Sequence, residues 1–345
     1  MIYLNLLIII LLIIFIHELG HYSVARLFKT RVTDFSIGFG KVLYQKKDKN
    51  NTNWKVSAFP LGGYVKIKGL ESIFKNTNKN EDIDEDSFQN LNLIKKNCIL
   101  LAGSFFNIIS AWLCLFCIFF FIGISSFSPI IGNVIEGSSA DINDIQKGDT
   151  VISVNNKNIK YFSDISKAIK NDTKIKIDIL RDNNLITKEL NLKFNEESGR
   201  YIIGIMSTDL VKINKYDLLL SLNKSLTFIP KYYGDTFKYL AQSYNNKTLK
   251  QNMFGPIGMV KIADQLMLDK IKGILFIFLT ISLFVGLFNL MPIPLLDGGH
   301  IVYFTLRSLF SDKLPAFITK LYLIAGITII SFLFIIITFN DIFNR

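Results

Sequence analysis

Four apolar runs match the length that a lipid bilayer demands of a helix, and they constrain this chain more than any other feature. A bilayer core needs roughly 17–25 mostly apolar helical residues. Half of the residues are hydrophobic and 30 are Phe, as expected when much of the surface faces lipid. The runs cover Ile2 to Ile16, which continues into a polar motif, and then Ile99 to Ile124, Ile271 to Met291 and Phe317 to Phe339. The sequence predicts a multi-pass α-helical membrane protein with four transmembrane helices.

The distribution of charge predicts the topology. Lys and Arg collect on the cytoplasmic side of membrane spans; Arg26 and Lys29 follow the first run, and Lys95 and Lys96 precede the second. Both termini and the segment after the second run are therefore expected outside. The first run lacks a basic leader and a small-residue cleavage site, which favours a retained helix over a signal peptide. Because the net charge of +11 is scattered, no nucleic-acid partner is expected.

Patterns between the runs divide the chain. Phe35, Ile37 and Phe39 alternate with smaller or polar residues, as do Trp54 and Val56 across a polar stretch, which predicts a β-hairpin. Residues 71–90 resemble an exposed linker, and residues 216–244 an aromatic-rich interfacial helix. The cysteines, two of them in an apolar C-x-x-C, imply no disulfide framework. The predicted domains are a membrane core at 1–127, a soluble insert at 128–207, an interfacial segment at 208–270 and a second membrane core at 271–345.

The first run ends in His17-Glu18-Leu19-Gly20-His21. On a helix this H-E-x-x-H spacing places two imidazoles on one face, where both can bind one Zn²⁺, and it leaves the glutamate as a general base that activates water. Ionisable residues at membrane depth are costly, so such a cluster indicates a functional site. Two histidines that merely cap the end of a span are the structural alternative. The prediction is a zinc site with His17 and His21 as ligands and Glu18 as the base.

A catalytic zinc site needs a third protein ligand, which here must also lie at membrane depth. Asp297 follows the third run in Asn289-Leu-Met-Pro-Ile-Pro-Leu-Leu-Asp-Gly-Gly-His300. Pro292 and Pro294 are expected to break the helix before it, and Gly298 and Gly299 to keep the backbone free beyond it. A role for Asp297 as a helix cap, or His300 as the ligand, remains open at this stage.

These motifs together resemble the site-2 protease family of intramembrane zinc metalloproteases, peptidase family M50. The bacterial regulator of sigma-E protease type is the most similar branch. The resemblance rests on HELGH, GFGK at 38–41, PLGGYVKI at 60–67 and NLMPIPLLDGGH at 289–300, all in the expected order. It implies zinc bound by His17, His21 and Asp297, water activated by Glu18, and a substrate-holding role for Asn289. It also implies cleavage of transmembrane segments of membrane-anchored proteins in the bacterial inner membrane, such as an anti-sigma factor or remnant signal peptides.

The insert resembles one PDZ domain on the periplasmic side. This resemblance rests on Ile135-Glu-Gly-Ser-Ser-Ala140 and Lys147-Gly-Asp-Thr-Val-Ile-Ser-Val-Asn155; a small β-rich spacer is the alternative. PDZ domains bind peptides at a sheet edge, and here the domain is expected to dock substrates or to filter them by size. Two departures from the family are Asn156 in place of a turn glycine, and Ser104 where the second-span motif A-G-P-x-x-N has proline, which leaves the helix geometry there in question.

A transmembrane helix must unwind before its peptide bonds can be hydrolysed. The hairpin offers a sheet edge with which the unwound substrate could pair, and Gly38, Gly40, Gly62 and Gly63 would let the two backbones approach, although turn chemistry also accounts for these glycines. Two other classes remain as alternatives: a catalytically silent scaffold that binds protein tails through its PDZ domain, and a transporter with a broken helix. The sequence leaves the oligomeric state open.

Overall fold

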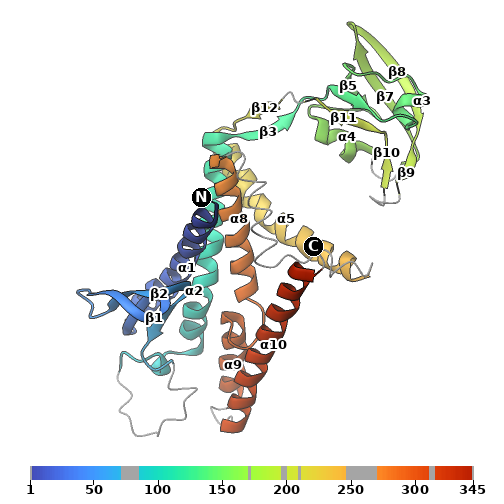
Figure 1. The fold of residues 1–345 in the computed structure, drawn as a ribbon. Helices are drawn as coiled ribbons and strands as arrows, with labels where there is room; N and C mark the ends of the chain where they lie inside the picture. The colour runs from blue at the N-terminus through green and yellow to red at the C-terminus, as the bar shows by residue number, and fades with distance from the viewer. Residues whose placement is uncertain are drawn as a thin grey trace. The chain divides into compact units, whose positions relative to one another are not determined.

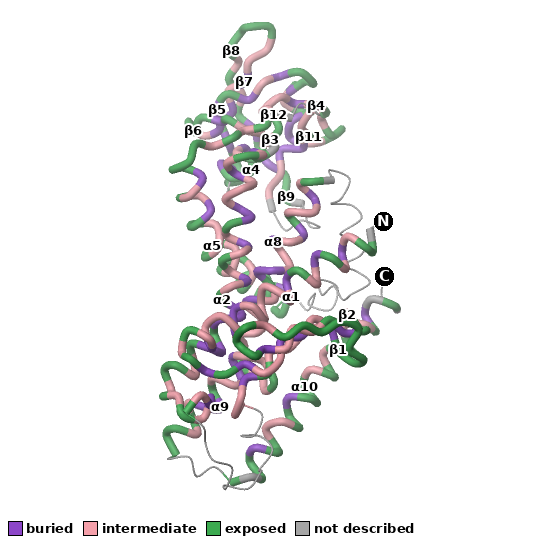
Figure 2. The backbone as a smooth tube through the Cα atoms, turned by 90° about the vertical axis from the view of Figure 1, so that its left-hand side faces the viewer, coloured by how far each residue is buried: buried purple, intermediate pink, exposed green. Residues whose placement is uncertain are grey.

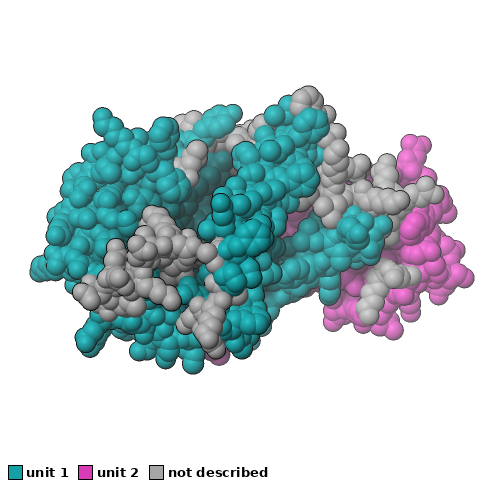
Figure 3. All heavy atoms as spheres, turned by 90° about the horizontal axis from the view of Figure 1, so that it is seen from below, with its two compact units in different colours: residues 1–118, 221–345 teal, residues 119–220 magenta. Residues whose placement is uncertain are grey.

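The computed structural model describes residues 2–70, 85–169, 172–195, 200–208, 211–245, 270–310 and 315–343. The chain divides into two compact units, coloured separately in Figure 3. Unit 1 contains residues 1–118 and 221–345, and unit 2 contains residues 119–220. Most of the predicted linker at 71–90, and residues 246–269 of the predicted interfacial segment, lie outside the described residues.

The four predicted spans are confirmed. Helices long and apolar enough to cross a membrane cover Tyr3–Leu27, Leu93–Ile122, Ile271–Asn289 and Phe317–Asn340. They belong to α1 (Ile2–Leu27), α2 (Leu93–Cys117) with the π-helical turn η3 (Ile118–Ile122), α8 (Lys270–Asn289) and α10 (Ala316–Phe343). The helix α9 (Asp297–Leu309) lies between the last two in the chain. In Figure 1, α1, α2 and α8 run side by side, so that unit 1 is built around their packing.

Most residues of these helices are only partly buried or exposed in the isolated chain, as lipid-facing positions would be. Figure 2 shows buried positions as short stretches along α1, α2 and α8 and few along α10. A small apolar cluster holds α1 to α8 through Leu6, Ile9, Ile13 and Ile277. Close approach of α1 and α2 depends on Gly20, because an added Cβ would collide with the Ala102 carbonyl. Small residues at such crossings are the usual way for membrane helices to pack. The helix α2 continues through Ser104, so serine in the place of proline does not interrupt it.

The predicted hairpin is present as β1 (Val32–Lys47) and β2 (Asn53–Ile67). Residues 32–39 pair with 59–67, and residues 42–47 pair with 53–57. Residues 34–37 also pair with residues 53–56. The two long strands are therefore bent into four short sheet segments, and residues 63–67 and 44–47 form the two outer ones. Gly38 and Gly40 have positive φ values of 87° and 84°, which an L side chain would strain, and they allow β1 to change direction there.

Aromatic packing and one carboxylate fix this sheet on α1. Phe35 is fully buried and stacks on Trp54 with ring centroids 4.3 Å apart. Asp48 accepts hydrogen bonds from the Tyr22 hydroxyl on α1 (3.1 Å) and from the Trp54 indole (3.0 Å). The sheet is thereby held beside the helix that carries the H-E-x-x-H motif.

The prediction that residues 71–90 form an exposed linker is wrong at Phe88. This residue begins the short helix η2 (Phe88–Asn90), is fully buried and packs in a cluster with Ile99, Tyr303 and Phe304. The polar composition of residues 71–90 concealed this one apolar anchor. The helix α5 (Leu218–Asn245) lies within the predicted interfacial segment, and its Tyr233 hydroxyl donates to the Leu283 carbonyl of α8 at 3.1 Å.

Unit 2, residues 119–220, contains the predicted insert and has somewhat wider bounds than the predicted 128–207. Its main sheet has the strand order β6-β5-β7-β8, and β4 pairs with β11, β9 with β10, and β3 with β12. Its helices are α3 (Ser139–Ile142) and α4 (Phe162–Ile169). Its core is aliphatic and includes Ile131, Val151, Ile165 and Ile177. The strands are β3 (Ile124–Phe127), β4 (Ile131–Val134), β5 (Thr150–Val154), β6 (Lys157–Asn158), β7 (Lys174–Arg181), β8 (Asn184–Asn191), β9 (Lys193–Asn195), β10 (Arg200–Ile202), β11 (Ile205–Ser207) and β12 (Val211–Asn214).

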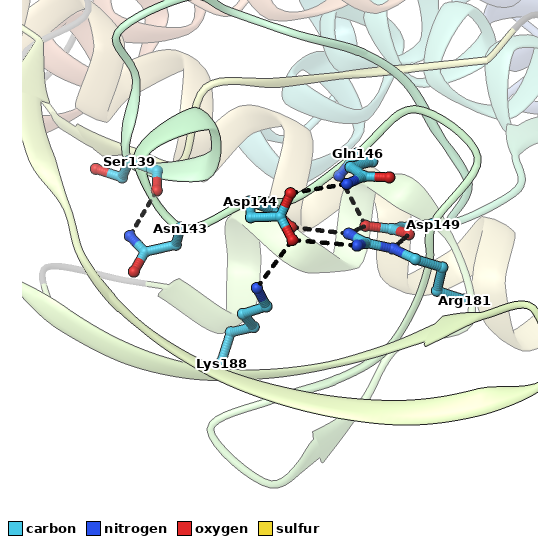
Figure 4. Close-up of polar contacts among 7 residues, drawn as sticks. All are labelled: Ser139, Asn143, Asp144, Gln146, Asp149, Arg181 and Lys188. Atoms are coloured by element: carbon cyan, nitrogen blue, oxygen red, sulfur yellow. Dashed lines mark hydrogen bonds and ion pairs between the residues drawn. The ribbon is translucent and has the colours of Figure 1, made fainter.

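A partly buried ion pair ties the loop before β5 to the end of β7 (Figure 4). Arg181 donates to both carboxylate oxygens of Asp149, at 2.7 and 2.8 Å, and Asp149 is only 1% exposed. Burial alone would raise the pKa of the Asp149 carboxyl. Hydrogen bonds from Arg181 and from the backbone amide of Gln146 outweigh this effect of burial and hold the pKa of Asp149 below its ordinary value.

Candidate metal centre

The helix α1 brings the two motif histidines to one face. Residues four apart on a helix are neighbours, and the His17 and His21 Nε2 atoms lie 3.3 Å apart. The rings are nearly perpendicular, at 84°. Both side chains are largely buried, with 12% and 10% of their surface exposed. The predicted placement of this motif on a helix is therefore correct, and its two nitrogens converge on one point.

Asp297 supplies the third atom of this cluster. Its Oδ2 lies 3.3 Å from the His17 Nε2 and 3.4 Å from the His21 Nε2. The chain reaches this position because α8 ends at Asn289 and the segment with Pro292 and Pro294 leads directly into α9, whose first residue is Asp297. Pro at these positions is consistent with the predicted interruption of the helix. His300 points elsewhere: its Nδ1 lies 3.0 Å from the Leu296 carbonyl, and it is not part of the cluster.

The three atoms fit a zinc ion. Tetrahedral Zn²⁺ with bonds near 2.0–2.2 Å separates its ligand atoms by about 3.3–3.5 Å, which matches the three distances between them. Hydrogen bonds explain the arrangement less well, because the buried Asp297 Oδ2 has no hydrogen-bond partner among the described residues. One cation at the centre would satisfy both nitrogens and the carboxylate oxygen.

The second nitrogen of each imidazole also has a neighbour on α2. The His21 Nδ1 lies 2.8 Å from the Ile99 carbonyl, so it carries the proton and leaves Nε2 free for a metal. The His17 Nδ1 lies 3.3 Å from the side-chain nitrogen of Asn107. Asn107 ends the Ala102–Asn107 motif, and its contact with His17 was not predicted.

Gly103 is a second residue whose role the sequence analysis missed. An added Cβ would collide with the His21 Nε2 and would lie 2.8 Å from the Cε1 atom of each histidine. Only glycine lets α2 approach the imidazoles this closely. A glycine in the middle of an otherwise apolar span was the available signal.

Glu18 faces the sheet. The Val65 backbone amide lies near its carboxylate, and an added Cβ on Gly63 would lie 3.2 Å from the Glu18 Cγ. The strand segment around Gly63 therefore runs directly beside the candidate base. The structure places Gly38, Gly40 and Gly62 in the same sheet, and Asn289 at the end of α8. Substrate binding by these four residues and Gly63 stays a prediction.

Gly298 needs a different explanation from the predicted one. Gly298 and Gly299 lie inside the first turn of α9, where the backbone is helical. A Cβ on Gly298 would collide with the Leu290 carbonyl, and one on Gly299 with the Ile293 carbonyl. These glycines allow the proline-containing segment to pack against the start of α9, which places Asp297 beside the histidines.

The comparisons with known proteins agree with this site. The family model for "Peptidase family M50" matches residues 5–333. Proteins named "Putative zinc metalloprotease" from Campylobacter jejuni, Rickettsia conorii and Fusobacterium nucleatum are 35%, 32% and 31% identical to this chain. The matches cover 96% of this chain in each case, and 90%, 96% and 96% of those proteins. With its three converging ligand atoms and four span-length helices, the chain therefore belongs to peptidase family M50, the site-2 protease family, and is a zinc metalloprotease of the membrane.

Proposed function

We propose that this zinc metalloprotease cleaves transmembrane segments of membrane-anchored proteins. The observation that carries the proposal is the position of its ligands, because His17 and His21 lie in one span-length helix and pack against Gly103 in another. A site enclosed in this way suits a substrate that arrives through the bilayer. Anti-sigma factors and remnant signal peptides are the substrate classes proposed by resemblance.

The sheet beside Glu18 supports a way to present such a substrate. A helix spanning the bilayer satisfies its own backbone groups, so a peptide that unwinds there needs new hydrogen-bond partners. Residues 63–67 form an outer segment of the sheet by register, next to the candidate base. We propose that the unwound segment pairs with this edge as an added strand.

The chemistry assigned to the chain's own groups is general acid–base catalysis. Zinc, when bound, acts as a Lewis acid and makes water a stronger nucleophile. Glu18 takes the proton from the attacking water and delivers it to the leaving nitrogen. Asn289, at the end of α8, is proposed to hold the substrate backbone.

The test uses the full-length protein in liposomes with a single-span substrate whose span contains a Gly-Pro pair. Mass spectrometry should locate cleavage within the apolar segment, and a matched substrate with a poly-Leu span should be cut more slowly because it resists unwinding. Glu18→Gln removes the base with little change in shape and should stop cleavage while zinc stays bound. Cleavage confined to soluble regions, or unchanged activity of Glu18→Gln, would refute the proposal.

We also propose that the sheet is membrane-associated. Its exposed apolar side chains support this, since in water they would form an unfavourable patch: Phe39, Val42, Leu43, Tyr44, Val56 and Phe59. The chain has two tryptophans, Trp54 in β2 and Trp112 in α2. In a Trp112→Phe variant, brominated lipids should quench Trp54 fluorescence; no quenching at any bromine depth would contradict the proposal.

Unit 2 is proposed to be a PDZ domain on the periplasmic face of the inner membrane, where it docks substrates or limits their size. Its order of β4, α3, β5, α4, β7 and β8 around an aliphatic core supports this. An impermeant maleimide should label a cysteine placed at exposed Lys157 in intact spheroplasts but not in sealed inverted vesicles, and the opposite pattern would reverse the topology. Weak binding of carboxyl-terminal peptides to the full-length protein would separate docking from size filtering.

A further inference from the structure

Asn107 on α2 faces the His17 imidazole with a group that does not match it chemically. Asn107 is fully buried in the middle of α2. Its side-chain nitrogen lies 3.3 Å from the His17 Nδ1, while its side-chain oxygen is buried without a hydrogen-bond partner among the described residues. Unsatisfied buried polar atoms are rare and call for an explanation.

The tautomer of His17 shows which group of the Asn107 amide should face it. When the Nε2 of a neutral imidazole donates its lone pair to a metal, the proton lies on Nδ1, which is then a donor. An amide nitrogen is also only a donor, so the two facing nitrogens cannot form a hydrogen bond. Oxygen and nitrogen of an amide have almost the same shape. A half-turn of the Asn107 amide exchanges the two groups and brings its oxygen to the His17 N–H, where an acceptor is required.

Asn107 is held firmly enough to orient a ligand. Its backbone carbonyl accepts hydrogen bonds from the hydroxyls of Ser110 and Ser282, each at 2.9 Å, and these two hydroxyls lie 3.1 Å apart. Ser282 lies on α8, whose Gly286 packs close to the same part of α2. Asn107 thus sits where α1, α2 and α8 meet, and this junction limits the movement of its side chain.

We propose that Asn107 is a positioning residue that accepts a hydrogen bond from the His17 Nδ1 through its side-chain oxygen. It fixes the tautomer and ring orientation in which the His17 Nε2 binds zinc, as the Ile99 carbonyl does for His21. The inference rests on the zinc ligands and not on the substrate proposed above. Ser110 and Ser282 serve to hold Asn107 in place.

The test measures zinc affinity by chelator competition on the purified full-length protein, without any substrate. Asn107→Leu keeps the size of the side chain and removes its acceptor, so zinc binding should weaken about 10–100-fold, as for other outer-shell partners of metal-binding histidines. Asn107→Asp keeps an acceptor at the same place and should bind zinc at least as tightly as the wild type. Ser104→Ala removes a buried hydroxyl one turn away on α2 that has no hydrogen-bond partner among the described residues, and it should leave the affinity unchanged.

Two results would overturn the inference. Wild-type affinity in Asn107→Leu would show that Asn107 does not position His17, and an affinity loss in Asn107→Asp equal to that of Asn107→Leu would show that the amide nitrogen is the group required. The melting temperature of each metal-free variant separates loss of the fold from loss of the ligand. If Asn107→Leu fails to fold, Asn107→Asp alone decides: tenfold weaker binding than the wild type refutes the role. Failure here would leave the proposed cleavage of transmembrane segments untouched, because no substrate is involved.

Discussion

Replacing Gly103 with alanine tests whether the packing of α2 on α1 sets the geometry of the zinc ligands. The new methyl group would lie 2.8 Å from the Cε1 atoms of His17 and His21 and would collide with the His21 Nε2. Carbon atoms normally pack about 3.5–4.0 Å apart. The rings must therefore retreat by roughly 0.7 Å or more, or α2 must move away from α1.

That displacement is large compared with what a metal site tolerates. Ligand distances in a functional site hold to within about 0.2 Å, so Gly103→Ala should weaken zinc binding more than about 100-fold, which corresponds to roughly 2.7 kcal/mol. The free energy of unfolding should change less than the free energy of zinc binding. Overpacking costs about 1–3 kcal/mol, and the higher helix propensity of alanine returns about 1 kcal/mol.

The assay is chelator competition for zinc with the full-length protein, beside thermal unfolding of the metal-free form. Gly234→Ala is the matched control, because Gly234 also lies inside a helix but has no atom of the described part of the chain within 4 Å of an added Cβ. Gly234→Ala should bind zinc as the wild type does. If Gly103→Ala does so too, the reasoning about this contact is refuted.

Three further outcomes are expected. Gly63→Ala should keep zinc but lower the cleavage rate more than about tenfold, since an added Cβ would collide with the Ser36 carbonyl, press on Ile14 and Glu18, and shift the sheet relative to the base; an unchanged rate with the model substrate would show that the sheet need not lie so close. Asp297→Asn should weaken zinc binding more than about 100-fold, beyond the effect of an outer-shell change, whereas His300→Ala, outside the cluster, should not; equal losses in the two variants would remove Asp297 from the ligand set. Because the pKa of Asp149 is depressed in the fold, its ion pair should stabilise unit 2 fully above the unfolded carboxyl pKa of about 3.9 and lose that contribution as pH falls through the folded pKa. Because Arg181 is 20% exposed and keeps Asp144 as a partner, Asp149→Asn should destabilise unit 2 by roughly 1–3 kcal/mol at pH 7. Its hydrogen-exchange protection should then fall less at low pH than that of the wild type, and a variant with the wild-type pH profile would contradict this.

Local patterns of residues were sufficient to predict the membrane helices, the hairpin strands and the two histidine ligands. Span-length apolar runs predicted four helices because a segment inside a bilayer finds no water and must form its backbone hydrogen bonds within itself. The spacing of His17 and His21 predicted a shared metal because helix geometry alone places residues four apart on one face. Alternation around Phe35 and Trp54 likewise predicted the strands, since their side chains must point to opposite faces.

Tertiary structure decided which distant residues complete the site. Sequence left Asp297 and His300 as candidate ligands, and only the packing of the proline-containing segment on Gly298 and Gly299 turns Asp297 toward the histidines. Composition could not identify Phe88 as a buried anchor within a polar stretch, nor assign Gly103 and Asn107 to the histidines. The four membrane helices, the two hairpin strands and the two-histidine motif were predictable, because each depends on neighbours along the chain. The third ligand and the contacts that orient the imidazoles depend on how helices far apart in sequence pack, and no local pattern encodes that geometry.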